Sequence, residues 1–200
     1  MKTPDFYEQM QSVVMIDPLA NLLGSVEDGR IEYRYVDAVK LCGHSCPTVA
    51  GAWQVVCAAL ARLYPDDTPR RGEIRVELRE ALTDGVAGVI ASVAGLVTGA
   101  ANAGGFKGLG GRYGRKDLLH FDVPMSGDIR FTRLDTQQAV EFVRGESSVP
   151  RPAQFASLLH AALSPDATPE AVRAFGAMWQ DWVAQRMTPD APPEWVEIRA

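Results

Sequence analysis

The stretch that most constrains the fold of this chain is residues 41–63, LCGHSCPTVAGAWQVVCAALARL. Proline is favoured at the first position of a helix, so Pro47 predicts that a long apolar helix begins there and that Cys46 directly precedes it. Cys42, His44 and Cys46 are expected in extended backbone, where residues two apart point to the same side. The sequence therefore predicts two thiols and one imidazole on one face at the entry to a core helix.

This set of side chains suits a transition metal or a nucleophile. The chain has three cysteines and three histidines, and three of these six side chains lie between positions 42 and 46. Thiolate and imidazole are ligands of zinc and iron, so Cys42, His44 and Cys46 are the predicted metal ligands. Closed structural zinc sites use four ligands, so either another segment supplies one or the site is open to solvent or substrate. Cys57, inside the helix, is expected to fill space in the core.

Length and composition fit one globular domain, alone or with a helical appendage. The chain has 200 residues, of which 46% are hydrophobic, enough to build a core. Its net charge of −5 argues against non-specific nucleic-acid binding. The longest weakly polar stretch, residues 85–105, is too rich in glycine and alanine for a membrane span, and no secretory signal is recognisable. We therefore expect a cytoplasmic protein with no nucleic-acid and no membrane partner.

Hydrophobic periodicity and turn residues predict an α+β order of elements. Strands are expected at 31–36, at 72–79, and at 118–123 and 129–134, the last two forming an antiparallel hairpin. Helices are expected at 4–23 (in two parts divided at Pro18), 47–64, 84–97, 136–144, 153–163 and 168–187, with a single helical turn at Asp37. The last residues, 192–198, either add an edge strand or stay loose.

Pro150 and Pro152 mark a boundary. Residues 1–150 are expected to form the α+β domain, and residues 151–200 a C-terminal helical extension that packs on it or on a dimer partner. Trp179 and Trp182 belong to an apolar stripe on the last helix. We expect this stripe in the core, with a dimer contact as the alternative.

Residues 99–116, GAANAGGFKGLGGRYGRK, combine glycines with basic side chains. Glycine lets the backbone approach a ligand closely, and successive N–H groups form anion-binding concavities. Lys107, Arg112 and Lys116 are therefore candidates to bind a phosphate or carboxylate group. The stretch matches neither the Walker A pattern nor the dinucleotide-binding fingerprint, so the preferred interpretation is a surface loop with solvated charges. Long glycine-rich loops in compact domains are nevertheless often lids or binding loops.

The segment CGHSCP at residues 42–47 resembles the His-Gly-His-x-Cys-Pro-Gly signature of the FmdE family, named after a component of formylmethanofuran dehydrogenase. The likeness continues in order over residues 38–187. It includes Glu77–Asp84 (the family's Glu…Cys-x-x-Asp segment), Gly95…Gly99…Asn102 (its glycine-rich stretch), Phe131–Asp135 with Ala139–Val140 (its hairpin and helix) and Phe155–Val183 (its C-terminal helices). The chain departs from the family at Cys42, where the family has the first histidine, and at Ala81, where it has a cysteine.

The resemblance implies an α+β fold with a curved, mainly antiparallel sheet packed with helices, and a homodimer. It maps His44 and Cys46 onto the family's metal or active-site pair, and Asp84 onto the acidic residue expected nearby. It implies little about the reaction.

Three functions compete. The first is a metal-dependent protein, with zinc or iron at the cysteine segment, that acts on a small anionic substrate. Its catalytic residues would be Cys46, His44 and Asp84, with Glu80 as the alternative general base and the basic loop Arg112–Lys116 holding the anion. The second is a non-catalytic metal or metallocofactor binding or trafficking protein that docks on a partner enzyme through the tryptophan stripe. The third is metal-free thiol chemistry at Cys46, with His44 as base. The sequence favours a metal-binding protein and leaves open whether it is an enzyme.

Overall fold

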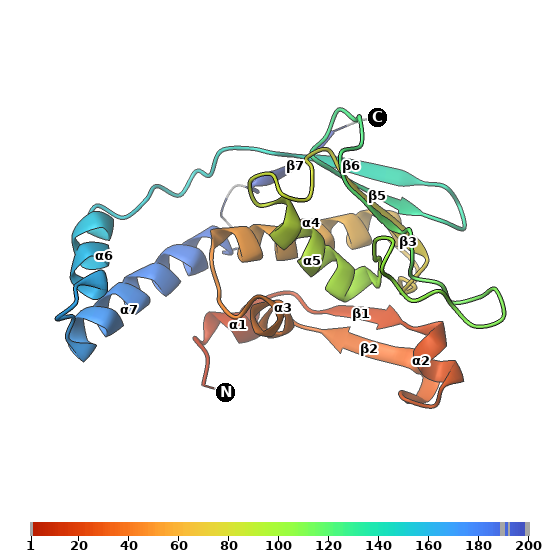
Figure 1. The fold of residues 1–200 in the computed structure, drawn as a ribbon, viewed down its shortest axis with the longest axis horizontal. Coiled ribbons are helices and arrows are strands. Elements are labelled where there is room, and N and C mark those ends of the chain that lie inside the picture. The colour runs from red at the N-terminus through yellow and green to blue at the C-terminus, as the bar shows by residue number, and fades with distance from the viewer. Residues whose placement is uncertain (1, 189–190, 192, 199–200) are drawn as a thin grey trace.

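The computed structural model describes residues 2–188, 191 and 193–198, which form an α+β fold as expected from the sequence (Figure 1). Its helices are α1 (Phe6–Gln9), α2 (Pro18–Leu22), α3 (Tyr35–Cys42), α4 (Pro47–Leu63), α5 (Ala87–Thr98), α6 (Phe155–Leu163) and α7 (Pro169–Arg186). Its strands are β1 (Val13–Ile16), β2 (Arg30–Tyr33), β3 (Ile74–Leu78), β4 (Leu119–His120), β5 (Ile129–Arg133), β6 (Ala139–Arg144) and β7 (Trp195–Ile198). A short 3₁₀ turn, Glu27–Gly29, precedes β2.

The described strands form two sheets with helices between them. The main sheet has the order β4-β3-β5-β6-β7, and β1 and β2 pair as a separate antiparallel sheet. β4 runs parallel to β3, whereas the other neighbouring pairs in the main sheet are antiparallel. α4 and α5 cover one face of the main sheet, and β1, β2 and α3 lie on the far side of these two helices (Figure 1). The described residues therefore form three layers with α4 and α5 in the middle.

The middle layer explains the composition of α4. Pro47 occupies its first turn, and Cys46 precedes it with extended backbone angles, φ −148° and ψ 169°. Because neighbours cover α4 from both sides, it buries residues on several faces, among them Val49 and Trp53, and its Cys57 is buried as expected. The prediction of a core helix from Pro47 is thus confirmed. Among the described residues no helix, α4 included, combines the length and apolar character that crossing a bilayer requires.

Residues 13–16 form strand β1, so the predicted helix over 4–23 is wrong in this part. Val13 and Met15 are buried and alternate with half-buried neighbours, which is the period of a strand. β-Branched residues favour extended backbone, and pairing with β2 outweighs the helical spacing that the prediction used. The second part of the prediction is right, because α2 begins at Pro18.

Two predictions near the centre of the main sheet are also wrong. Residues 118–123 do not form a hairpin with 129–134, because β4 pairs with β3 instead. The hairpin partner of β5 is β6, so residues 139–144 form a strand and not the end of a helix. Val140 and Phe142 are buried against the core, and the short turn before β6 makes antiparallel pairing with β5 the nearest arrangement.

Ion pairs join three strands on the outer side of the main sheet. Arg130 on β5 donates to both carboxylate oxygens of Glu77 on β3, at 2.8 and 3.0 Å, and to Glu141 on β6 at 2.9 Å. The hydrogen bonds from Arg130 hold the pKa of the Glu77 carboxyl below its usual value. Cross-strand pairs of opposite charge stabilise the register of a sheet.

The C-terminal part supplies a helical hairpin and a strand. α6 packs on α7, and the pair projects from one end of the layers (Figure 1). Four rings hold α6 on α7, with centroids 5.6 to 6.0 Å apart, from Phe155, Phe175, Trp179 and Trp182. Trp182 is buried, in line with the core interpretation of the stripe. β7 pairs with β6 as the edge strand, which was one of the two alternatives for these residues.

The buried carboxylate of Asp17 links three distant segments. It accepts hydrogen bonds from the backbone N–H groups of Leu19 and Ala20 at the start of α2. It also accepts from Arg71, which precedes β3, at 3.0 Å and from Arg115, in the glycine-rich loop, at 2.7 Å. Burial alone would raise the pKa of Asp17, but the hydrogen bonds and the two arginine charges together hold it below its usual value.

Replacing this carboxylate should destabilise the fold. Asp17→Asn keeps the size and the helix cap but leaves two guanidinium groups without their shared anion. We expect the free energy of unfolding at pH 7, measured by urea denaturation, to fall by about 3 kcal/mol. The exposed Asp66→Asn is the matched control and should change it by less than about 0.5 kcal/mol.

The same pair of variants tests the pH dependence. Because the pKa of Asp17 is lower in the folded state, its stabilisation is complete above its unfolded-state pKa of about 3.9 and is lost as pH falls through the folded-state value. The gap between wild type and Asp17→Asn should therefore narrow below about pH 4. An unchanged gap in acid, or no gap at pH 7, would contradict the assigned role.

Candidate functional site

The cysteine segment is a turn between two helices and not an extended strand. Cys42 is the last residue of α3, Gly43 follows with φ +75° in the left-handed region, and Cys46 directly precedes α4. The predicted extended backbone at 42–46 is therefore wrong. The expected single turn at Asp37 continues as a full helix because α3 buries one face, with Tyr35, Ala38 and Val39, against the middle layer.

The turn carries both thiols, with Cys42 at the end of α3 and Cys46 directly before α4. Burial raises the pKa of the Cys42 thiol, and the negative charge of a Cys46 thiolate raises it further. The exposed His44 ring has its Nδ1 2.9 Å from the carbonyl oxygen of Cys42. When Nδ1 carries the proton and donates this bond, Nε2 is free to accept.

The three predicted ligands do not form a ready metal site. Within the described part of the chain, no three side chains of the His, Cys, Asp or Glu type gather closely enough to hold a metal ion. The i, i+2 geometry that would have aligned Cys42, His44 and Cys46 requires extended backbone, and α3 with its left-handed end at Gly43 replaces it. To bind one metal ion, the side chains of Cys42 and Cys46 would have to rotate towards Nε2 of His44.

A cavity of about 380 Å³ lies beside this turn. Cys42 and His44 line it from the end of α3, and the segment before α5 together with its first turns lines the opposite side. Asp84 is exposed, and its neighbour Gly85 lines the cavity. A Cβ on Gly85 would lie 3.6 Å from Oε2 of Glu80, so the Glu80 carboxylate stands at the same rim. Of the predicted catalytic residues, His44 lines this cavity, whereas Cys46, Asp84 and the alternative base Glu80 are not among its lining residues.

Residues from three helices fix the turn from behind. The Ser45 carbonyl oxygen accepts from Trp179 Nε1 at 2.8 Å and from the Gln180 side chain at 3.3 Å, both on α7. The Ser45 hydroxyl lies 2.7 Å from the hydroxyl of Tyr35, and Tyr7 donates to Gln180 at 3.2 Å. Sequence reasoning did not identify these supporting residues. The one signal was Trp179 itself, because a packed tryptophan usually needs an acceptor for its N–H.

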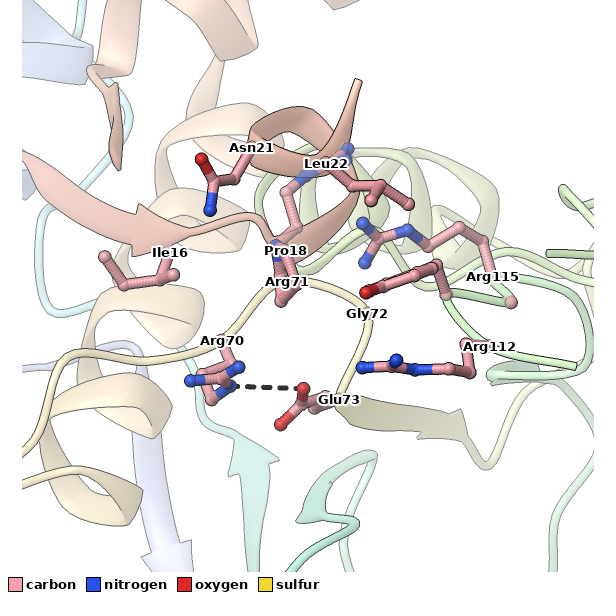
Figure 2. A pocket seen from close by; sticks show the side chains of 12 residues that line it. Ile16, Pro18, Asn21, Leu22, Arg70, Arg71, Gly72, Glu73, Arg112 and Arg115 are labelled. Carbon is pink, nitrogen blue, oxygen red and sulfur yellow. Dashed lines mark hydrogen bonds and ion pairs between the residues drawn. The ribbon is translucent and has the colours of Figure 1, made fainter. Parts of the chain in front are cut away.

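The predicted anion-binding residues lie elsewhere. Lys107 and Lys116 are exposed, and Lys116 pairs with Asp117 at 3.4 Å. Arg112 lines a second cavity near α2 (Figure 2). The segment forming that cavity contacts the C-terminal end of α5, where the Gly72 N–H donates to the Thr98 carbonyl. The cysteine cavity lies at the N-terminal end of α5, which has 12 residues and is about 18 Å long. Within one chain the structure therefore separates the basic loop from the cysteine turn.

Comparisons with known proteins do not assign this chain to a class. No protein-family model matches it, and no curated protein does. The likeness of residues 38–187 to the FmdE family remains a resemblance, and the functional argument rests on the geometry of the turn.

The three thiols should differ in reactivity. Cys57 is buried, which raises the pKa of its thiol to about 12, so iodoacetamide should leave it unlabelled in the folded protein at neutral pH. Cys46 lies at the start of α4 with no side chain capping the helix N–H groups, and we expect it to react before Cys42. Time-resolved peptide mass spectrometry measures the order. Labelling in urea, where all three should react, is the control, and rapid labelling of Cys57 without urea would contradict the packing.

Proposed function

We propose that the turn between α3 and α4 binds a thiophilic transition metal ion, zinc or iron, at an open site of Cys42, His44 and Cys46. The observation that carries this proposal is the contact between His44 Nδ1 and the Cys42 carbonyl oxygen, in a turn that also carries the Cys46 thiol. Histidines that bind metals commonly donate their other ring N–H to a carbonyl, which orients the free nitrogen.

The donor set fits zinc or iron chemically, although it is not assembled in the described structure. Cys42 and Cys46 are half-buried, and rotation of their side chains towards Nε2 of His44 would keep the contact between His44 Nδ1 and the Cys42 carbonyl. Hydrogen bonds between Ser45 and the side chains of Tyr35, Trp179 and Gln180 hold the backbone of the turn. Metal binding would therefore require movement of side chains and not of the backbone. Three protein donors leave a further position for solvent, substrate or a partner's side chain.

The residues around the turn form a small cavity that is open to solvent on one side. Leu41 and Leu82 form apolar rims and are about half exposed, at 49% and 52%, while Val86 and Val89 line the interior of the cavity. A bound metal ion would supply Lewis-acid chemistry at this position. A catalytic role would in addition require a general base, for which Glu80 and Asp84, close in sequence to the lining residues Leu82 and Gly85, are the candidates. The proposal itself concerns metal binding.

We further propose that the protein is cytoplasmic and forms a homodimer. Cys42, Cys46 and Cys57 are all free, the state that a reducing cytoplasm maintains. The resemblance to the FmdE family implies a homodimer, and the projecting α6–α7 pair offers an arm that a second copy could contact. Exposed apolar residues on this arm include Leu163 and Val172.

Metal-free thiol chemistry at Cys46 is the second candidate. It is favoured by the lack of a ready group of three donors among the described residues and by the presence of a second thiol, Cys42, in the same turn. The trafficking alternative has less support, because Trp179 of its docking stripe is already engaged with Ser45.

Measuring the metal content distinguishes metal binding at the turn from metal-free thiol chemistry at Cys46. Tag-free protein, reconstituted with zinc or ferrous iron under reducing conditions, should hold about one ion per chain by elemental analysis. Cys46→Ser and His44→Ala should each weaken binding by about tenfold or more. Cys57→Ala and His160→Ala are the matched controls, since Cys57 is buried in α4 and His160 is exposed on α6. With cobalt as probe, the sulfur-to-metal absorption should weaken in Cys46→Ser, where Cys42 is the one remaining sulfur ligand, and should be unchanged in Cys57→Ala.

Two outcomes would count against the metal proposal. One is absence of metal after reconstitution together with ready formation of a Cys42–Cys46 disulfide, which would support thiol chemistry. The other is equal loss of metal in the control and site variants, which would indicate adventitious binding.

A further inference from the structure

A second cavity, of about 500 Å³, is lined by four arginines (Figure 2). It lies between α2, the segment 70–73 before β3 and the segment 112–115 of the glycine-rich loop. The arginines are Arg70, Arg71, Arg112 and Arg115. Such a gathering of cations is unexpected in a chain whose net charge is −5. It lies at the other end of α5 from the cysteine turn, so it is independent of the proposed metal site.

Two of these arginines are held rigidly. Arg71 and Arg115 share the buried carboxylate of Asp17, at 3.0 and 2.7 Å. Gly72 has φ +84°, and a Cβ there would collide with Nη1 of Arg115. A Cβ on Gly99 would lie 3.0 Å from the same nitrogen. The Arg115 guanidinium therefore occupies a space that a side chain at position 72 would fill, and it is tightly packed against Gly99.

The positive charge of the cavity is only partly neutralised. Asp17 supplies one negative charge to two guanidinium groups, and Arg70 is paired with Glu73 at 3.1 Å. Burial lowers the pKa of Arg115, and the nearby charge of Arg71 adds to that effect. The buried Nε of Arg71 has no hydrogen-bond partner among the described residues. A bound anion would offset the positive charge that Asp17 leaves unbalanced on Arg71 and Arg115.

Of the four arginines, Arg112 is the one whose position is not explained by a salt bridge to another described residue. It is exposed, makes no salt bridge within the described part of the chain, and lies over the ring of Tyr113 at 4.9 Å. Figure 2 shows its guanidinium extending into the opening towards Glu73, opposite Arg70. Because Arg112 is exposed and has no salt bridge among the described residues, its guanidinium is available to an anion that enters the opening.

We propose that this cavity binds the phosphate group of a small phosphorylated molecule. Guanidinium groups match phosphate oxygens in geometry, and Arg70 lies on one side of the opening with Arg112 and Arg115 on the other. The volume is larger than a phosphate ion needs and falls in the range of small-molecule sites. The organic part would contact Pro18 and the half-exposed Leu22 of α2.

Arg112→Gln and Lys107→Gln are the matched test pair, because both residues are exposed on the same loop and only Arg112 lines the cavity. Calorimetric titration at low salt with inorganic phosphate and with ribose 5-phosphate measures the affinity. We expect Arg112→Gln to weaken binding by about tenfold and Lys107→Gln by less than about twofold. Affinity should also fall as salt is raised. Tighter binding of ribose 5-phosphate than of inorganic phosphate would support a phosphorylated molecule as the ligand, and the reverse would overturn that part of the proposal.

Glu73→Gln should change the affinity for phosphate in the opposite direction to Arg112→Gln. It removes the carboxylate that competes for Arg70, so phosphate binding should become several-fold tighter. Cys46→Ser should leave phosphate affinity unchanged, which separates this proposal from the metal site. Absence of binding at about 10 mM probe, or equal losses in Arg112→Gln and Lys107→Gln, would overturn the proposal.

Discussion

One buried carboxylate connects the layers of this protein. Asp17 stands between β1 and α2, and it pairs with Arg71 before β3 and with Arg115, which lies 98 residues further along the chain. Removing one partner of a buried ion pair leaves an uncompensated charge and is strongly destabilising. The β1–β2 sheet, the start of the main sheet and the glycine-rich loop must therefore come together as a unit. The loop is held to the core at Arg115, although its outer residues are exposed.

This anchoring also decides where the two candidate sites lie. α5 runs through the middle layer, with the cysteine turn beside its first turns and the arginine cavity beside its last. A helix is a rigid spacer, so the groups at its two ends cannot act on one small molecule within a single chain. Arg112 and Cys46 were assigned to one site from the sequence because a sequence does not show how far apart two residues lie in the fold. The structure gives each its own surroundings and its own chemistry.

The cysteine turn shows how far local pattern can be trusted. Pro47 was sufficient to predict α4 and the place of Cys46, because the preference of proline for a first helical turn acts over one or two residues. The position of Cys42 was not predictable in the same way. Its backbone depends on α3, whose helix is stabilised by burying Tyr35 and Val39 against layers that are distant in sequence. The same dependence turned residues 139–144 into a strand, because β5 is their partner.

By itself the sequence determined the fold class, the core helix, the strands that alternate and the supply of thiols, imidazoles and guanidinium groups. These properties follow from periodicity, from proline and from composition, which act locally. Only the tertiary structure decided the strand partners, the bend between Cys42 and Cys46, the support of Ser45 by Trp179 and the meeting of Arg71 with Arg115. Each of these depends on contacts between segments far apart in the chain, where packing and the pairing of buried charge outweigh local preference.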